Sequence, residues 1–216
     1  MQHLAFSFFP LLAAYIAAEN RYRFRIATTL KLILTGTLFV CLTIASLLSF
    51  SIPLALATAG MCCAAVGDFF LQYIKKDTSR FIHGIRWFAL AQICNLIVLH
   101  LVSGFSLWEL VLTAVLLGII AAMKFSQGWD TSAVDPWLTG YTALVAFVGG
   151  KGLSMLLMGN TAAVHILGLG AFLFYLSDLA LGIWNYRHSK LWLADVNWVL
   201  YFSGQFLLTL GYTMAS

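Results

Sequence analysis

The chain has 216 residues, of which 62% are hydrophobic and 9% are charged, and its formal net charge at neutral pH is +4. Its mean hydropathy of +0.92 excludes an ordinary soluble domain, because such domains are about 45–50% apolar and about 25% charged. The composition therefore predicts an all-α integral membrane protein, and we expect residues 1–216 to form a single membrane domain.

Eight apolar runs separated by short polar breaks predict a polytopic bundle of eight transmembrane helices. A helix needs about 20 mainly apolar residues to cross the hydrocarbon layer. The first run is the shortest, so it either crosses or lies partly in the interface, and its start lacks the lysine or arginine of a signal peptide. In chain order the runs are 4–18, 26–50, 52–74, 81–102, 107–123, 137–158, 161–184 and 191–212.

Lysines and arginines gather in alternate connections between the runs. They follow the first, third, fifth and seventh runs, whereas the connections after the second, fourth and sixth runs and the two termini have none. The positive-inside rule then places the basic connections in the cytoplasm and both termini outside it. The net charge is thus a topology signal, and we expect no nucleic-acid partner.

A weak internal repeat relates the two halves of the chain. A shift of 110 residues lays Asp68 on Asp178 and Asn95 on Gln205. Because the shift passes four runs, it predicts two four-helix halves with parallel orientation. Parallel repeats of this kind occur in transporters as well, so the repeat supports an architecture without choosing a function.

Two acids, Asp68 and Asp178, lie inside the third and seventh runs. Each is six residues from the cytoplasmic end of its run, which at 1.5 Å per residue is roughly 9 Å below the boundary. An ionised side chain in hydrocarbon is unfavourable, so an acid at this depth usually faces a packed interior or a wet cavity and serves a function. We interpret the two acids as a functional pair, and a structural buried ion pair is the alternative.

Other charged side chains belong to the same layer of the membrane. Lys31 and Arg86 either offset the charge of the acids or snorkel to the boundary. Asp195 either joins the site or caps a helix near the connection. In the opposite half of the membrane, Lys151 is expected to snorkel outward or to pair with Glu109.

Three motifs and one lysine resemble the YhhN family of membrane lysoplasmalogenases, and the resemblance covers essentially the whole chain. The matching elements are Gly67-Asp68-x-x-Leu71, Phe174-x-x-Ser177-Asp178-Leu179, Tyr201-Phe-x-Gly204-Gln205 and Lys31. The chain departs from the family pattern at Leu32, where proline is common, and at Gln92 and Asn95, where histidine and tyrosine are common. These departures leave both aspartates in place and bear on the role of the fourth run and on the exact substrate.

The resemblance implies hydrolysis of the vinyl ether bond of a lysoplasmalogen, which releases a fatty aldehyde and glycerophosphoethanolamine or glycerophosphocholine. Protonation of the β-carbon leaves an oxocarbenium ion, to which water adds. This chemistry needs a carboxylic acid and a carboxylate, as in glycosidases, and we expect no metal or other cofactor. Asp68 and Asp178 are the expected catalytic pair, and either could be the acid.

The resemblance also implies a bacterial inner membrane as the location, with a lysophospholipid substrate and membrane lipids as partners. We expect Lys31 and Arg86 to hold the substrate phosphate, and further substrate contacts from three side chains: Asp195, Tyr201 and Gln205.

Two other classes of protein stay open. A proton- or cation-coupled secondary transporter would move its substrate unchanged, and a lipid-binding protein would return a lysolipid intact. The cytoplasmic bias of the polar layer favours the enzyme over the carrier.

Overall fold

The computed structural model describes the whole chain except residues 1, 23, 72–77, 129–134 and 187–189. The described residues form eight α-helices and no strand, which confirms the all-α prediction. Each predicted run lies mainly on one helix, and residues 72–74 of the third run are outside the described residues. Parts of all four basic connections on which the predicted topology depends lie outside the described residues. The helices are α1 (Gln2–Asn20), α2 (Phe24–Ser49), α3 (Ile52–Leu71), α4 (Thr78–Ser103), α5 (Leu107–Gln127), α6 (Asp135–Met158), α7 (Ala162–Tyr186) and α8 (Leu191–Ala215).

Six of the described helices, α2 to α7, are long and apolar enough to cross a membrane. Large apolar side chains such as Leu48, Leu101 and Val115 are exposed on the outside of the bundle. A helix that is apolar on its outer as well as its inner face fits a lipid surrounding. The protein is therefore an integral membrane protein, while crossings by α1 and α8 stay a prediction.

The buried face of α8 carries polar residues. Asn197, Gln205 and Thr209 are each less than 5% exposed. Since these side chains face neighbouring helices, they do not meet lipid. The polar residues of α8 therefore belong to the interior of the bundle.

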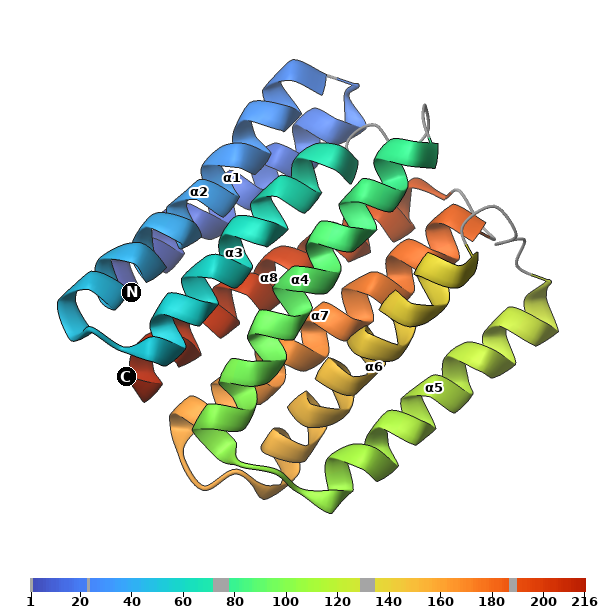
Figure 1. The fold of residues 1–216 in the computed structure, drawn as a ribbon. Helices are drawn as coiled ribbons and strands as arrows, with labels where there is room; N and C mark the ends of the chain where they lie inside the picture. The colour runs from blue at the N-terminus through green and yellow to red at the C-terminus, as the bar shows by residue number, and fades with distance from the viewer. Residues whose placement is uncertain (1, 23, 72–77, 129–134, 187–189) are drawn as a thin grey trace.

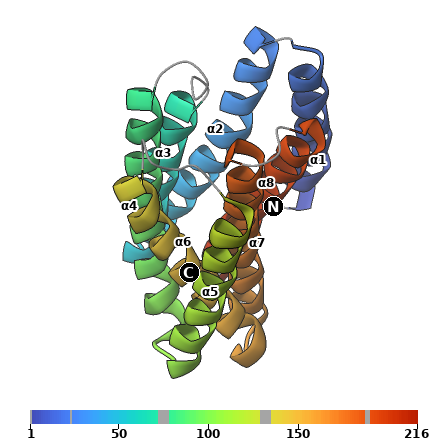
Figure 2. The same ribbon diagram turned by 90° about the vertical axis from the view of Figure 1, so that its right-hand side faces the viewer.

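The helices pack in chain order in two series. In the first series α1 contacts α2, α2 contacts α3 and α3 contacts α4, and in the second α5 to α8 do the same. Contacts of α8 with α1, α2 and α3, and of α4 with α6 and α7, join the two series. Figures 1 and 2 show α5 at one edge of the bundle, and both termini at the end that carries the α2–α3, α4–α5 and α6–α7 turns.

The shift of 110 residues found in the sequence also relates the helices. It lays α1 to α4 on α5 to α8 with helix ends that agree to within five residues. The order of helix contacts is the same in both series. This order is compatible with two parallel halves, and the repeat itself stays a prediction.

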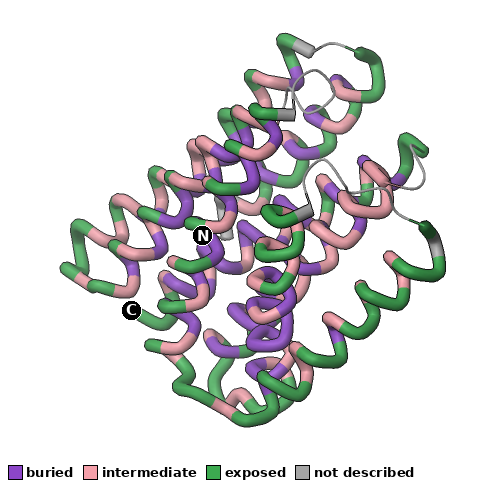
Figure 3. The backbone as a smooth tube through the Cα atoms, turned by 45° about the vertical axis from the view of Figure 1, so that its right-hand side comes forward, coloured by how far each residue is buried: buried purple, intermediate pink, exposed green. Residues whose placement is uncertain are grey.

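Close packing of α7 against α8 lies at the centre of the fold. Figure 3 shows buried residues along the inner faces of the helices, whereas α5 is largely exposed. A Cβ atom at Gly170 would lie 3.0 Å from the Gly204 carbonyl oxygen, and one at Gly204 would lie 2.9 Å from the Gly170 carbonyl oxygen. Because neither glycine has a side chain, the backbones of α7 and α8 can approach each other closely here. One turn before Gly204, the Tyr201 ring packs 5.5 Å from that of Phe174 on α7.

Candidate functional site

A cavity of about 950 Å³ lies inside the bundle and is lined by residues from all eight helices. Both Asp68 on α3 and Asp178 on α7 line it. The structure thus brings the two acids, which are 110 residues apart in the chain, to one space. Its size is in the range of pockets that bind small molecules, which is about 300–1,000 Å³.

The Asp68 carboxylate is surrounded by three donors. The Lys31 ammonium lies 2.8 Å from Oδ1, and the hydroxyls of Thr35 and Tyr201 donate to Oδ2 at 3.2 and 2.9 Å. Lys31 and Asp68 are only 2% and 3% exposed. Charge-assisted hydrogen bonds of this kind are stronger than neutral ones, so these donors hold the Asp68 side chain firmly in place.

Lys31 is fixed in this position by an aromatic ring as well as by the acid. Its Nζ atom lies 4.3 Å from the centroid of the Trp198 ring, within the range of a cation–π interaction. The snorkelling alternative for Lys31 is wrong, because its side chain is buried. Lys31 does line the cavity, but Asp68 already balances its charge.

Asp178 has a different kind of partner. The Tyr141 hydroxyl donates to its Oδ2 atom at 2.6 Å. Across the described residues, no ion pair joins Asp178 to a lysine, arginine or histidine. The two acids of the cavity are therefore unlike, since one is paired with a cation and the other with a phenol.

The internal repeat relates these two surroundings. The shift that lays Asp68 on Asp178 also lays Lys31 on Tyr141, so in each half the partner comes from the helix before the acid. Our sequence reasoning missed Tyr141, although applying the shift to Lys31 would have found it. It also missed Thr35, for which the sequence offers no comparable signal.

The glycine of the Gly67-Asp68 motif makes room for an aromatic ring. A Cβ atom at position 67 would lie 2.7 Å from the ring of Phe88 on α4. Phe88 lines the cavity and packs edge-on against Tyr201, with ring centroids 6.0 Å apart. Gly67 therefore allows α4 to close one wall of the cavity beside Asp68.

Three other predicted site residues do not line the cavity. Arg86 is exposed, and its guanidinium lies 4.0 Å from the centroid of the Trp137 ring. Asp195 accepts hydrogen bonds from the Asn20 amide at 3.0 and 3.1 Å, which tie α8 to α1. Gln205 is buried within the bundle. Of the five predicted substrate contacts, Lys31 and Tyr201 are the two that reach the cavity.

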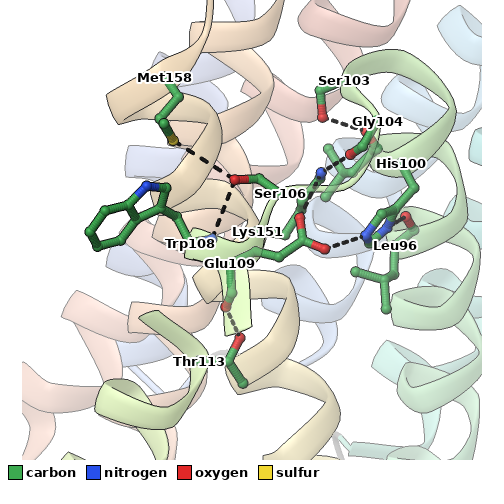
Figure 4. A network of polar contacts seen from close by, with 11 residues as sticks. Leu96, His100, Ser103, Gly104, Ser106, Trp108, Glu109, Thr113, Lys151 and Met158 are labelled. Atoms are coloured by element: carbon green, nitrogen blue, oxygen red, sulfur yellow. Dashed lines mark hydrogen bonds and ion pairs between the residues drawn. The ribbon is translucent and has the colours of Figure 1, made fainter. Parts of the chain in front are cut away.

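A second buried polar cluster joins α4, α5 and α6 away from the cavity (Figure 4). Glu109 lies 2.8 Å from both Lys151 Nζ and His100 Nε2. The Lys151 ammonium also donates to the Gly104 carbonyl oxygen. Pairing with Glu109, one of the two predictions for Lys151, is confirmed. The cluster holds the first turn of α5, which begins after the N-cap Ser106.

The side chains that line the cavity include groups suited to acid–base chemistry. The Tyr175 hydroxyl is buried without a hydrogen-bond partner among the described residues, and Tyr175 lines the cavity. Among all the residues that the structure describes, no three His, Cys, Asp or Glu side chains lie together as a group that could hold a metal ion. A carboxylic acid and a carboxylate in one site can serve as general acid and general base.

Comparison with known proteins supports the resemblance seen in the sequence. The sequence model of the YhhN family matches residues 21–212, a range that includes both aspartates, Lys31, Tyr141 and Tyr201. Neither the curated proteins nor the solved structures contain a match to this chain. Since the family match extends over far more than half of the sequence, the chain belongs to the YhhN family.

Proposed function

We propose that this protein is a lysoplasmalogenase, which hydrolyses the vinyl ether bond of lysoplasmalogens in the membrane. The observation that carries the proposal is the presence of two unlike carboxyl groups in one cavity, Asp68 beside Lys31 and Asp178 beside Tyr141. Membership of the YhhN family is consistent with a hydrolase. Vinyl ether hydrolysis needs two such groups, because a proton is given to carbon and another is taken from water.

Asp178 suits the role of the acid. A carboxyl group in a low-dielectric cavity favours its neutral form when no cation lies beside it. The Tyr141 hydroxyl donates to Oδ2, so the proton of Asp178 belongs on Oδ1. Transfer of that proton to the β-carbon uses the π electrons of the double bond and leaves positive charge shared by the α-carbon and the ether oxygen.

Asp68 suits the role of the base. Its carboxylate, paired with Lys31, stabilises the oxocarbenium ion and takes a proton from the water that adds to the α-carbon. The hemiacetal then collapses. Asp178 takes the hemiacetal hydroxyl proton, Asp68 returns its proton to the glycerol oxygen, and the C–O bond breaks. One water is consumed and both acids regain their starting states.

The two sides of the cavity suit the two ends of a lysolipid. Polar lining residues such as Glu19 and Arg25 come from α1 and α2, and apolar ones such as Ile85 and Val145 come from α4 and α6. The acid-bearing helices lie between these sides, because α3 contacts α2 and α4, and α7 contacts α6 and α8. Arg25 and Glu19 complement a phosphate and an ammonium group, so we place the head group there and the alkenyl chain opposite.

We also propose that α1 and α8 complete eight crossings of a bacterial inner membrane, with both termini outside the cytoplasm. The polar side of the cavity is then near the cytoplasmic surface, because it is formed by the end of α1 and the start of α2. A lysolipid of the inner leaflet would have its head group at this level.

The proposal is tested by incubating the purified protein with alkenyl, alkyl and acyl lysophospholipids and identifying the products by mass. We expect free aldehyde from the alkenyl lipids and none from the others. Asp68→Asn and Asp178→Asn should each abolish aldehyde release while the protein still unfolds cooperatively on heating. Aldehyde release by both variants would refute the acid pair. Uptake of intact lysolipid into sealed proteoliposomes, without any aldehyde, would instead identify a transporter.

A further inference from the structure

We propose that Asn197 on α8 binds the free hydroxyl on the middle (sn-2) carbon of the substrate glycerol and is a specificity-determining residue. The inference rests on the proposed function, since it takes an alkenyl lysophospholipid as the substrate. In such a lipid the sn-2 hydroxyl lies between the phosphate and the vinyl ether. Recognition of this hydroxyl would select lysolipids over lipids that carry an acyl group at the same carbon.

Asn197 is a buried polar residue whose amide has unused hydrogen-bonding capacity. It is 4% exposed and lines the cavity, and no hydrogen bond joins its side chain to another residue that the structure describes. The fully enclosed polar atoms without a partner belong to other residues, so the Asn197 amide keeps access to the cavity. A buried amide without a partner is unfavourable, and this one is therefore expected to bind a polar group inside the cavity.

The order of residues along α8 places Asn197 between the head-group end of the cavity and the proposed base. Asp195, two residues earlier, accepts hydrogen bonds from the Asn20 amide at the end of α1. Tyr201, four residues later, lines the cavity and donates to Asp68 Oδ2 at 2.9 Å. Residues four apart are neighbours on one face of a helix, so Asn197 is about 6 Å along the axis from Tyr201.

Neighbouring contacts hold this turn of α8 beside the base. The ring of Trp198, the residue after Asn197, lies 4.3 Å from Lys31 Nζ, and Lys31 pairs with Asp68 at 2.8 Å. Trp198 also packs edge-on against Tyr15 of α1, with ring centroids 5.5 Å apart. Contacts with both α1 and α2 therefore fix the place of Asn197 in the cavity wall.

A lysoplasmalogen presents its groups in the same order as this wall of the cavity. Its phosphate is followed by the sn-2 carbon, and then by the ether oxygen and the alkenyl chain. With the head group near Arg25 and the vinyl ether at Asp68, the sn-2 hydroxyl reaches the level of Asn197.

The amide of asparagine suits this hydroxyl. Its Oδ1 atom accepts the hydroxyl proton, and its Nδ2 atom can donate to an oxygen of the adjacent phosphate. A site that hydrogen-bonds a substrate hydroxyl rejects an analogue that lacks it, because a buried polar group of the site is then left unpaired. An acyl group at the sn-2 carbon has no hydroxyl proton to offer, so Asn197 would disfavour it.

The experiment measures kcat/KM for aldehyde release from two lipids that differ only at the sn-2 carbon, an alkenyl lysophospholipid and its 2-deoxy analogue. Each value is divided by the rate of acid hydrolysis of the same lipid in solution, which removes the effect of the hydroxyl on the reactivity of the vinyl ether. We expect the wild-type protein to prefer the hydroxyl lipid by about tenfold, the scale of one hydrogen bond.

The same ratio is then measured for Asn197→Ala and Asn197→Leu, of which the second keeps a side chain of similar size. Each variant should lose about tenfold in kcat/KM for the hydroxyl lipid, again the scale of one hydrogen bond. Neither should lose further activity toward the deoxy lipid, so the preference should fall to about one. A purely structural defect would instead lower both values together.

The matched control is Asn95→Ala. Asn95 is also a buried asparagine, but it accepts a hydrogen bond from the Tyr212 hydroxyl at 3.0 Å and does not line the cavity. This variant loses a buried amide without touching the proposed hydroxyl site, so we expect its preference for the hydroxyl lipid to equal that of the wild type.

Two outcomes would overturn the role of Asn197. Equal normalised kcat/KM values of the wild-type protein for the two lipids would do so, and this comparison does not depend on the folding of any variant. A preference retained by the Asn197 variants would also do so, because another residue would then read the hydroxyl. If the wild-type protein releases aldehyde from neither lipid, the proposed function itself fails, and the two failures are thereby distinguished.

Discussion

Replacing Lys31 with methionine tests the ion pair on which the proposed base depends. The substitution leaves Asp68 buried without a cation, and breaking a buried pair by removing one partner typically costs about 3–5 kcal/mol. The hydrogen bonds from Thr35 and Tyr201 remain, so we expect the lower part of this range. For a chain of this size, about 2–4 °C of melting temperature corresponds to 1 kcal/mol, so a fall of roughly 6–12 °C follows for about 3 kcal/mol.

Thermal unfolding in detergent, followed by circular dichroism, measures this effect, and the double variant Lys31→Met/Asp68→Asn provides the control. Removing the charge of Asp68 as well should recover much of the lost stability, because no uncompensated carboxylate is left. The double variant should also lack aldehyde release, because asparagine cannot act as a base. A melting temperature for Lys31→Met within about 2 °C of the wild type, equivalent to at most 1 kcal/mol, would refute the reasoning.

Three further substitutions test other parts of the structure. Tyr141→Phe removes the 2.6 Å donor to Asp178, so kcat should fall by roughly tenfold, the scale of one hydrogen bond, and an unchanged kcat would contradict this. Glu109→Gln leaves Lys151 buried without an acid, so the melting temperature should fall while kcat of the folded protein is retained, and adding Lys151→Met should restore stability. Gly204→Leu should destabilise the α7–α8 contact by about 1–3 kcal/mol through overpacking, and unchanged thermal unfolding would exclude that contact as drawn.

The helices were predictable because a bilayer imposes a simple rule on sequence. A long apolar run must be helical to satisfy its backbone, and each of the eight runs lies mainly on one helix. The ends were less predictable. The predicted run 107–123 stops where polar residues begin, whereas α5 continues to Gln127 and ends at Gly128, which adopts φ 61° and donates to the Lys124 carbonyl. Hydropathy therefore marks the lipid boundary, and capping decides where the helix stops.

Depth in the membrane identified both acids but could not identify their partners. Depth is one coordinate, and a contact also requires the direction around each helix and the identity of the neighbouring helix. Lys31 and Arg86 were predicted to share one layer, yet Lys31 reaches Asp68 while Arg86 is exposed and lies over an aromatic ring. The polar layer was thus predictable from sequence, and the pairing within it required the arrangement of the helices.

The difference between Lys31 and Tyr141 is what makes the two acids unlike. These residues occupy positions related by the 110-residue shift, and each contacts the acid of its own half. Two lysines would keep both carboxyl groups ionised and leave the cavity without an acid. Tyr141→Lys should therefore preserve folding, because the new ammonium can pair with Asp178, and yet abolish aldehyde release.

Comparison with Tyr141→Phe separates this effect from loss of the hydroxyl alone. The phenylalanine variant leaves Asp178 without a cation and able to donate its proton, so it should retain measurable turnover, whereas the lysine variant should have none. Melting temperatures of both variants, measured with the activities, exclude misfolding as the cause. Full aldehyde release by a stably folded Tyr141→Lys protein would show that a neutral Asp178 is not required, and the unlike surroundings of the two acids would then need another explanation.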